Sequence, residues 1–183
     1  MYFEKPGKEF TAQTVQLAVQ AVKEYGIRHV VLATTTGFTA EAFPELEGVS
    51  VICVPLAYGF KEPGKNELSD EMIAKIESKK GFKVYAASHA LSGAERGITS
   101  KFGGVSPVEM IAHTLRFFGQ GMKVCVEIAT MAADGGLLPP NEPIVAIGGT
   151  GRGADTAVIM RAAHANHILE TKIDRILCKP ILP

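Results

Sequence analysis

The segment Val30-Val31-Leu32-Ala33-Thr34-Thr35-Thr36-Gly37-Phe38-Thr39 sets the architecture that the sequence predicts. Its first four residues are aliphatic and rich in β-branched side chains, which is typical of a buried strand. Three threonines and a glycine then interrupt this run, and helix formers resume at residues 39–43. The segment therefore predicts a strand, a tight loop and a helix in direct succession.

The same alternation continues on both sides of this segment. Apolar residues at helical spacing over residues 11–25, followed by Gly26, predict a preceding helix. Further strands are expected at residues 49–54, 83–87, 144–147, 156–160 and 172–179, and further helices at 69–80, 107–118 and 122–133. Apolar strands that alternate with helices favour a mostly parallel sheet with helices on both faces. We expect an α/β fold: one three-layer αβα domain over residues 1–183, with an antiparallel late strand.

Composition restricts the classes of partner. Lys and Arg number 19 and so do Asp and Glu, so no net charge draws the chain to nucleic acid. No uncharged run approaches the roughly 20 apolar residues that span a bilayer, so we expect no membrane partner and a cytoplasmic location. Any anionic ligand must therefore be held by local groups.

Cysteines and histidines give no pattern of a metal site. Cys53, Cys125 and Cys178 are far apart in apolar surroundings, and we interpret them as buried thiols. A reactive thiol or a metal ligand is the alternative, but it requires a partner at ligand spacing. His164 and His167 are three residues apart without an evident third ligand. We expect no bound metal.

The threonine-rich turn is a candidate phosphate site. Backbone N–H groups at the start of a helix are unpaired and point outward, and threonine hydroxyls add further donors. The residues concerned are Thr34, Thr35, Thr36, Gly37, Phe38 and Thr39. The alternative is that these threonines only cap the helix and fill a turn.

The glycine-rich stretch Gly148-Gly149-Thr150-Gly151-Arg152-Gly153-Ala154-Asp155 is a second candidate. Its glycines let the backbone approach a ligand closely, and Arg152 offers a fork to a phosphate or a carboxylate. The spacing of Gly149, Gly151 and Ala154 imitates the dinucleotide-binding fingerprint. That fingerprint must open a helix, whereas residues 155–160 are expected to be extended. An exposed arginine on a flexible hairpin remains the alternative.

Two further segments contain candidate residues. Residues 59–65 imitate the P-loop spacing, but Asn66 replaces the required Ser or Thr and Pro63 removes a backbone donor. We expect a solvated loop there, in which Tyr58 and Phe60 could offer an aromatic face to a flat ligand. Residues 89–106 are expected to form a long irregular segment, which makes its titratable members catalytic candidates by location: His89, Glu95, Arg96 and Lys101.

The order of these motifs resembles the C-terminal domain of pyruvate kinase, whose sugar-phosphate effector site uses a Thr/Ser-rich loop and a late glycine-rich loop. The chain is still more similar to a stand-alone archaeal and bacterial family with that domain, through Lys61-Glu62-Pro63-Gly64, Ser88-His89-Ala90-Leu91-Ser92-Gly93, Lys101-Phe102-Gly103-Gly104 and residues 148–155. The resemblance implies flavin mononucleotide (FMN) as the occupant, with Gly59, Phe60, His89 and Ser92 also lining its site. It also implies a homodimer. The (β/α)₈ barrel of the kinase cannot fit in this chain, because such a barrel needs about 250 residues.

Three hypotheses follow for the function. In the first, the chain is a binding or sensor protein for a phosphorylated small molecule held between the threonine and glycine loops. In the second, it is a flavin-dependent oxidoreductase with the flavin ring against Tyr58, Phe60 or Phe102 and with His89 or Lys101 acting on a substrate. In the third, it is a structural subunit whose loops stay empty.

Overall fold

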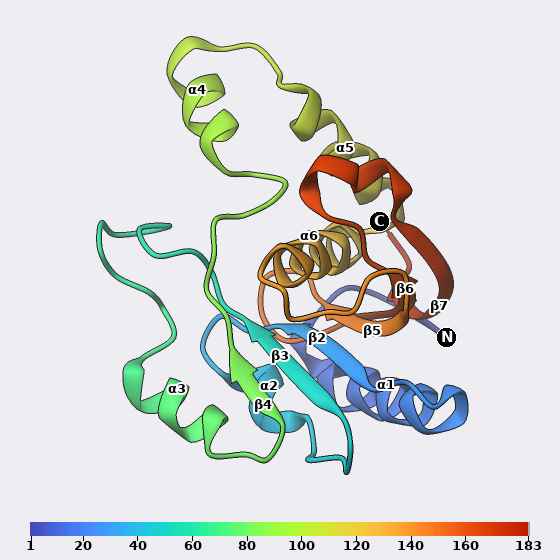
Figure 1. Cartoon of the computed structure of the whole chain (residues 1–183). Coiled ribbons are helices and arrows are strands. Elements are labelled where there is room, and N and C mark those ends of the chain that lie inside the picture. The colour runs from blue at the N-terminus through green and yellow to red at the C-terminus, as the bar shows by residue number, and fades with distance from the viewer. Residues whose placement is uncertain (183) are drawn as a thin grey trace.

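A computed structural model describes residues 1–182 as a seven-stranded sheet with helices on both faces (Figure 1). The strands run in the order β1-β7-β6-β5-β2-β3-β4. Their bounds are β1 Tyr2–Phe3, β2 His29–Ala33, β3 Ser50–Val54, β4 Phe82–Val84, β5 Pro143–Gly148, β6 Thr156–Arg161 and β7 Lys172–Pro180. The helices are η1 Lys8–Phe10, α1 Thr11–Tyr25, α2 Phe38–Ala42, α3 Asp70–Glu77, α4 Ala94–Phe102, α5 Pro107–Leu115, η2 Arg116–Phe118, α6 Gln120–Asp134 and η3 Ala165–Glu170.

The sheet is mixed, as expected. β2 pairs in parallel with both β3 and β5, and β3 pairs in parallel with β4. β6 is antiparallel to both of its neighbours, β5 and β7, whereas the short β1 is parallel to β7. The expectation of a mostly parallel sheet with an antiparallel late strand is therefore confirmed.

Two apolar clusters separate the three layers. Alternate residues of a strand point to opposite faces of the sheet, and β2 divides accordingly. Val30 and Leu32 join the cluster that contains residues of α1, α2 and α3, while Val31 joins the cluster built on α6. The αβα sandwich expected from the alternation of strands and helices is thus the observed architecture.

The segment 89–106 differs from the expectation of an irregular loop. It contains α4, whose first turn is held by a hydrogen bond of 2.7 Å from the Gly93 amide to Glu95 Oε1. α4 buries no residue, although Ala94, Ile98 and Phe102 recur at a spacing of four. Figure 1 shows α4 projecting away from the sheet, where it contacts α5.

Smaller differences concern element ends. α3 ends at Glu77 rather than near residue 80, and β4 covers Phe82–Val84 rather than 83–87. β1 was not expected because its two residues lie in a polar, charged terminus. Its place at the sheet edge comes from tertiary pairing with β7, which local sequence does not reveal.

Candidate ligand-binding site

A cavity of about 380 Å³ lies at the carboxyl ends of β2 and β3, beside the loop that follows β5. In the sheet, β2 has β3 on one side and β5 on the other, so the strand order changes direction at β2. Open α/β sheets bind ligands at the carboxyl ends of strands at such a switch point. The volume falls within the range of small-molecule sites. The topology therefore predicts a ligand at the place where the cavity lies.

The threonine loop forms one wall of this cavity. Five of its six predicted residues line it: Thr34, Thr35, Thr36, Phe38 and Thr39. Gly37 does not line the cavity. It adopts a φ of 97°, and its amide donates a hydrogen bond of 3.1 Å to Thr34 Oγ1. Because α2 has only five residues, donors here come from the loop rather than from a substantial helix dipole.

The glycine loop forms the adjoining wall through Gly149, Gly151, Arg152 and Gly153. A Cβ on Gly149 would lie 2.2 Å from the carbonyl oxygen of Gly153, so the loop closes on itself too tightly for any side chain there. Gly153 has a φ of 71°, in the left-handed region that favours glycine. The glycines that were expected to let the backbone approach a ligand thus first let the loop pack against itself.

Thr150, Ala154 and Asp155 hold the glycine loop rather than line the cavity. Asp155 is fully buried, and its carboxylate accepts hydrogen bonds from the Thr150 amide at 3.1 Å and from the Thr156 hydroxyl at 2.8 Å. The Ala154 amide donates to Thr11 Oγ1 at 2.9 Å. Asp155 was expected to contact the ligand; its carboxylate is bonded within the loop and does not line the cavity.

Both loops face the same cavity, although they are far apart in the sequence. Two exposed cationic side chains, Lys8 and Arg152, stand beside them. Lys8 lies against the glycine loop, since a Cβ on Gly153 would be 2.8 Å from Lys8 Cα. The arrangement brings hydroxyls, backbone amides and two cations to one end of the cavity.

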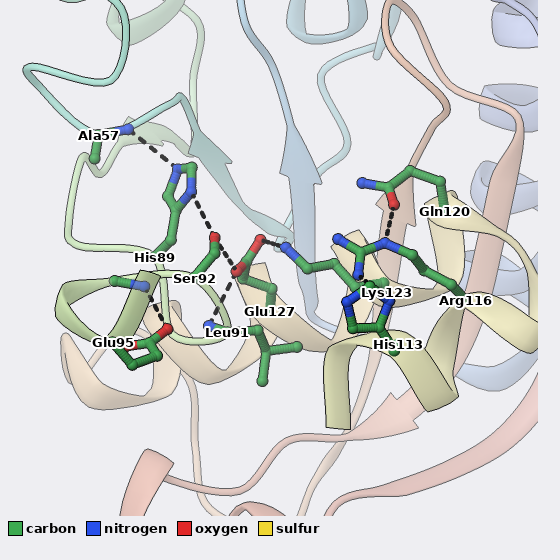
Figure 2. A network of polar contacts seen from close by, with 11 residues as sticks. Ala57, His89, Leu91, Ser92, Glu95, His113, Arg116, Gln120, Lys123 and Glu127 are labelled. Atoms are coloured by element: carbon green, nitrogen blue, oxygen red, sulfur yellow. Dashed lines mark hydrogen bonds and ion pairs between the residues drawn. The ribbon is translucent and has the colours of Figure 1, made fainter. Parts of the chain in front are cut away.

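A buried polar network also lines this cavity (Figure 2). Lys123 Nζ donates to Glu127 Oε2 at 2.5 Å, and the Leu91 amide donates to Glu127 Oε1 at 3.0 Å. The Ser92 hydroxyl donates to the same Oε1 at 3.3 Å. Burial lowers the pKa of Lys123, and the nearby Arg116 and Arg96 lower it further against the opposing effect of Glu127.

His89 continues this network. Its Nε2 accepts a hydrogen bond of 3.2 Å from the Ala57 amide, and its Nδ1 lies 3.3 Å from the Ser92 hydroxyl. An accepting Nε2 implies the neutral tautomer protonated at Nδ1. Burial lowers the pKa of His89, which favours the same neutral form. His89 and Ser92 therefore line the cavity, as expected, within a chain of donors that leads to Glu127.

An aromatic surface lies next to His89. The Phe60 ring centroid is 5.3 Å from that of His89, and the Arg96 guanidinium lies 5.7 Å from the Phe60 centroid. Phe60 and Arg96 both line the cavity, whereas Tyr58, Phe102 and Lys101 do not. Gly59 stays in its own turn, where its amide donates to the Lys65 carbonyl. Of the three candidate ring contacts, Phe60 lines the cavity and Tyr58 and Phe102 do not.

Several cavity residues were missed by the sequence analysis: Lys8, Arg116, Gln120, Lys123 and Glu127. Lys123 and Glu127 did carry a signal. They are oppositely charged, four residues apart, and placed within an otherwise apolar helical stretch, so they share one helix face. Lys8 and Arg116 carried none, because the cavity wall is completed by segments that only tertiary folding brings together.

The fold and cavity define a single α/β domain whose cavity is lined by two loops and a buried ion pair. The chain belongs to the family of the pyruvate kinase alpha/beta domain, whose family model matches residues 12–160. The resemblance to the pyruvate kinase C-terminal domain is thereby confirmed.

Solved pyruvate kinases are also similar to the chain. Pyruvate kinase from Cryptosporidium parvum in complex with ADP matches at 14% identity with a TM-score of 0.43, over 84% of this chain and 24% of that one. Another structure of the C. parvum enzyme matches at 14% identity with a TM-score of 0.40, over 84% and 22%. This chain therefore spans about a quarter of the length of these kinases.

Among residues 1–182, no three His, Cys, Asp or Glu side chains gather in a way that could hold a metal ion. No helix in that same range has the length and apolar character to cross a membrane.

Proposed function

We propose that this protein binds a phosphorylated small molecule, with the phosphate held between the threonine loop and the glycine loop. The observation that carries the proposal is that Thr35, Thr36, Gly151 and Arg152 line one cavity. Lys8 adds a second cation at the same end. The chain has equal numbers of acidic and basic residues, so this local concentration of donors is what would attract an anion.

The energetics favour a dianion over a neutral group. A hydrogen bond to a charged group contributes about 1.5 to 3 kcal/mol. Arg152 can make two such bonds in a fork, and hydroxyls and loop amides can supply others. Three or four of these contacts contribute about 4.5 to 12 kcal/mol, a range that includes the roughly 8 kcal/mol of micromolar binding. A ligand that lacks the phosphate loses most of this contribution.

FMN is the first ligand to test. Its phosphate suits the loops, and its flat ring suits the face formed by Phe60 and His89 in the same cavity. Aromatic stacking of this kind is worth about 0.5 to 1.5 kcal/mol beyond area burial. In this proposal the chain acts as a binding or sensor protein for the ligand.

A flavin-dependent oxidoreductase is the second candidate. The observation in its favour is that titratable groups, His89, Lys123 and Glu127, line the same cavity as the phosphate loops. A bound flavin would supply the hydride chemistry. The residues of this chain would exclude water and hold a substrate, with Lys123 as the donor that faces the cavity.

Spectroscopy separates these candidates. Freshly purified protein would be desalted and its visible spectrum recorded, then titrated with FMN, riboflavin and several sugar phosphates. Tight binding of phosphorylated ligands supports the proposal, whereas equal binding of FMN and riboflavin contradicts it. Reduction of bound FMN by a nicotinamide donor at catalytic rates would select the oxidoreductase, and binding without turnover would select the sensor.

We also propose a homodimer that forms through α4, α5 and η2. Six large apolar side chains of this region are exposed: Ile98, Phe102, Val105, Met110, Phe117 and Phe118. Three of the six are phenylalanines, and an aromatic side chain can bury roughly 150 to 250 Å². With the three aliphatic side chains, they can supply a large part of the about 800 Å² per partner of a standard interface. The chain has no net charge that would oppose contact with a second copy.

A further inference from the structure

Lys123 is a buried amine in the wall of a ligand-sized cavity. Its side chain is 5% exposed, and within residues 1–182 the polar partner of its Nζ is Glu127. An ammonium group can donate three hydrogen bonds. A lysine that is desolvated in a pocket is a recognised type of activated nucleophile.

Glu127 is fixed as a proton acceptor for this amine. Oε1 accepts hydrogen bonds from the Leu91 amide and the Ser92 hydroxyl, and Oε2 accepts from Lys123 (Figure 2). The Ser92 hydroxyl is in turn within 3.3 Å of His89 Nδ1. These contacts hold the carboxylate beside the amine, in the position needed to take up a proton and return it.

The helix that carries Lys123 packs against the base of the glycine loop. The first turn of α6 packs on the base of the glycine loop, because a Cβ on Gly121 would be 2.1 Å from Thr156 Oγ1. A Cβ on Gly148 would likewise be 2.5 Å from the Gly121 carbonyl oxygen and 3.1 Å from Val124 Cβ. Lys123 lines the same cavity as the threonine and glycine loops, so a ligand held by these loops can extend to its amine.

Stability alone does not explain this ion pair. Burial of two charges costs several kcal/mol, so a buried pair is often no better for stability than apolar residues of similar volume. A charged pair at a cavity wall can instead act on a ligand. Perturbed ionisable groups in a cleft are candidates for such a functional site.

We propose that Lys123 forms a reversible imine with phosphorylated aldehydes or ketones that are held by the threonine and glycine loops. This inference rests on the proposed phosphate site and adds a chemical class of ligand and a covalent step. FMN and these carbonyl compounds would compete, because their phosphates occupy the same loops.

The step balances without an added oxidant or reductant. Glu127 takes one proton from the Lys123 ammonium, and the freed nitrogen lone pair forms a bond to the carbonyl carbon. The carbonyl π electrons move to oxygen, which receives a proton from the nitrogen and gives a carbinolamine. Glu127 then returns its proton to the hydroxyl, which departs as water and leaves the iminium. The products are the protonated imine and one water molecule.

Reductive trapping tests the inference on the full chain. Dihydroxyacetone phosphate and dihydroxyacetone are each incubated with the protein and sodium cyanoborohydride, which reduces an iminium ion to a stable amine. We expect one adduct, located on Lys123 by peptide mass spectrometry, and at least tenfold faster trapping of the phosphorylated ketone. Inorganic phosphate or FMN should slow the trapping.

Variants separate chemistry from folding. Lys123→Arg keeps the ion pair but removes the nucleophile, so it should abolish the adduct while Lys80→Arg, at a lysine outside the cavity, leaves it unchanged. Glu127→Gln keeps the amine and should slow trapping at least tenfold. Circular dichroism of each variant verifies the fold.

The outcomes distinguish this inference from the proposed function. An adduct spread over surface lysines, or one that survives in Lys123→Arg, overturns the imine. Calorimetric binding of FMN and phosphate without any adduct also overturns the imine, but it supports the phosphate site. Absence of both phosphate binding and adduct overturns the two together.

Discussion

Thr11 Oγ1 accepts a hydrogen bond of 2.9 Å from the Ala154 amide, which ties the glycine loop to the first residue of α1. The same hydroxyl donates to the Lys8 carbonyl at 2.7 Å. Thr11 is 2% exposed, so this contact is shielded from water. One threonine thus fixes both the loop that carries Arg152 and the turn that carries Lys8.

Thr11→Val should destabilise the protein by about 1 to 3 kcal/mol, because it leaves the buried Ala154 amide unpaired while keeping the side-chain shape. The measurement is the free energy of unfolding in urea. Thr130→Val is the matched control, since Thr130 Oγ1 has no hydrogen-bond partner in the part of the chain that the structure describes. That control should be neutral or slightly stabilising. Equal losses in both variants would contradict the role of Thr11.

His89 should make stability depend on pH. Burial lowers its pKa below the ordinary value of 6.5, with Lys123 and Arg96 adding to the effect and Glu127 opposing it. The unfolded chain therefore binds a proton at this site more readily than the folded chain does. Stability from this group is present above pH 6.5 and falls as the pH is lowered towards its depressed pKa. Urea unfolding at several pH values checks this, and His89→Gln should flatten the slope in that window.

The three thiols should be unreactive in the folded protein. Burial raises the pKa of Cys53 to about 12 and raises that of Cys125 and Cys178 as well. Because the thiolate is the reactive form, titration with a thiol reagent at pH 8 should find none accessible in native protein and three after denaturation. Rapid labelling of native protein at any one cysteine would show that its surroundings open to solvent.

The apolar surface of α4, α5 and η2 should drive self-association. Phe102 is 76% exposed in the single chain, and Phe102→Glu places a charge where a second copy would pack. Analytical ultracentrifugation should give a dimer for the unaltered chain and a monomer for this variant. Leu169→Glu, which changes an 83% exposed residue of η3, serves as the control and should stay dimeric. A monomeric unaltered chain would refute the homodimer.

The sequence predicted the sheet well because buried strands and amphipathic helices leave periodic signals. Residues 30–33 and 144–147 are short aliphatic runs, each followed by threonine or glycine, and both belong to central strands. α4 escaped prediction because its amphipathic pattern buries nothing in this chain. β1 was not predicted because two residues are too few to show an alternation of apolar and polar side chains. They form a strand because they pair with β7.

The site was predictable only where a loop carries its own signal. Thr34 to Thr36 and Gly149 to Gly153 stand out as compositional breaks after strands, and both loops reach the cavity. Local spacing cannot show that the Asp155 carboxylate turns inward to the Thr150 amide. Lys123 and Glu127 lie within a helix that is predicted from its apolar residues alone, so the prediction does not single out this charged pair.

Calorimetric titration of FMN and riboflavin into the unaltered chain and into Arg152→Ala tests the phosphate site most directly. Loss of one charge-assisted contact of about 1.5 to 3 kcal/mol should weaken FMN roughly ten- to a hundredfold. Riboflavin should be unaffected, and Arg28→Ala, at an exposed arginine outside the cavity, should change neither ligand. Equal weakening of FMN and riboflavin by Arg152→Ala, or no preference for FMN in the unaltered chain, would contradict a phosphate held between these two loops.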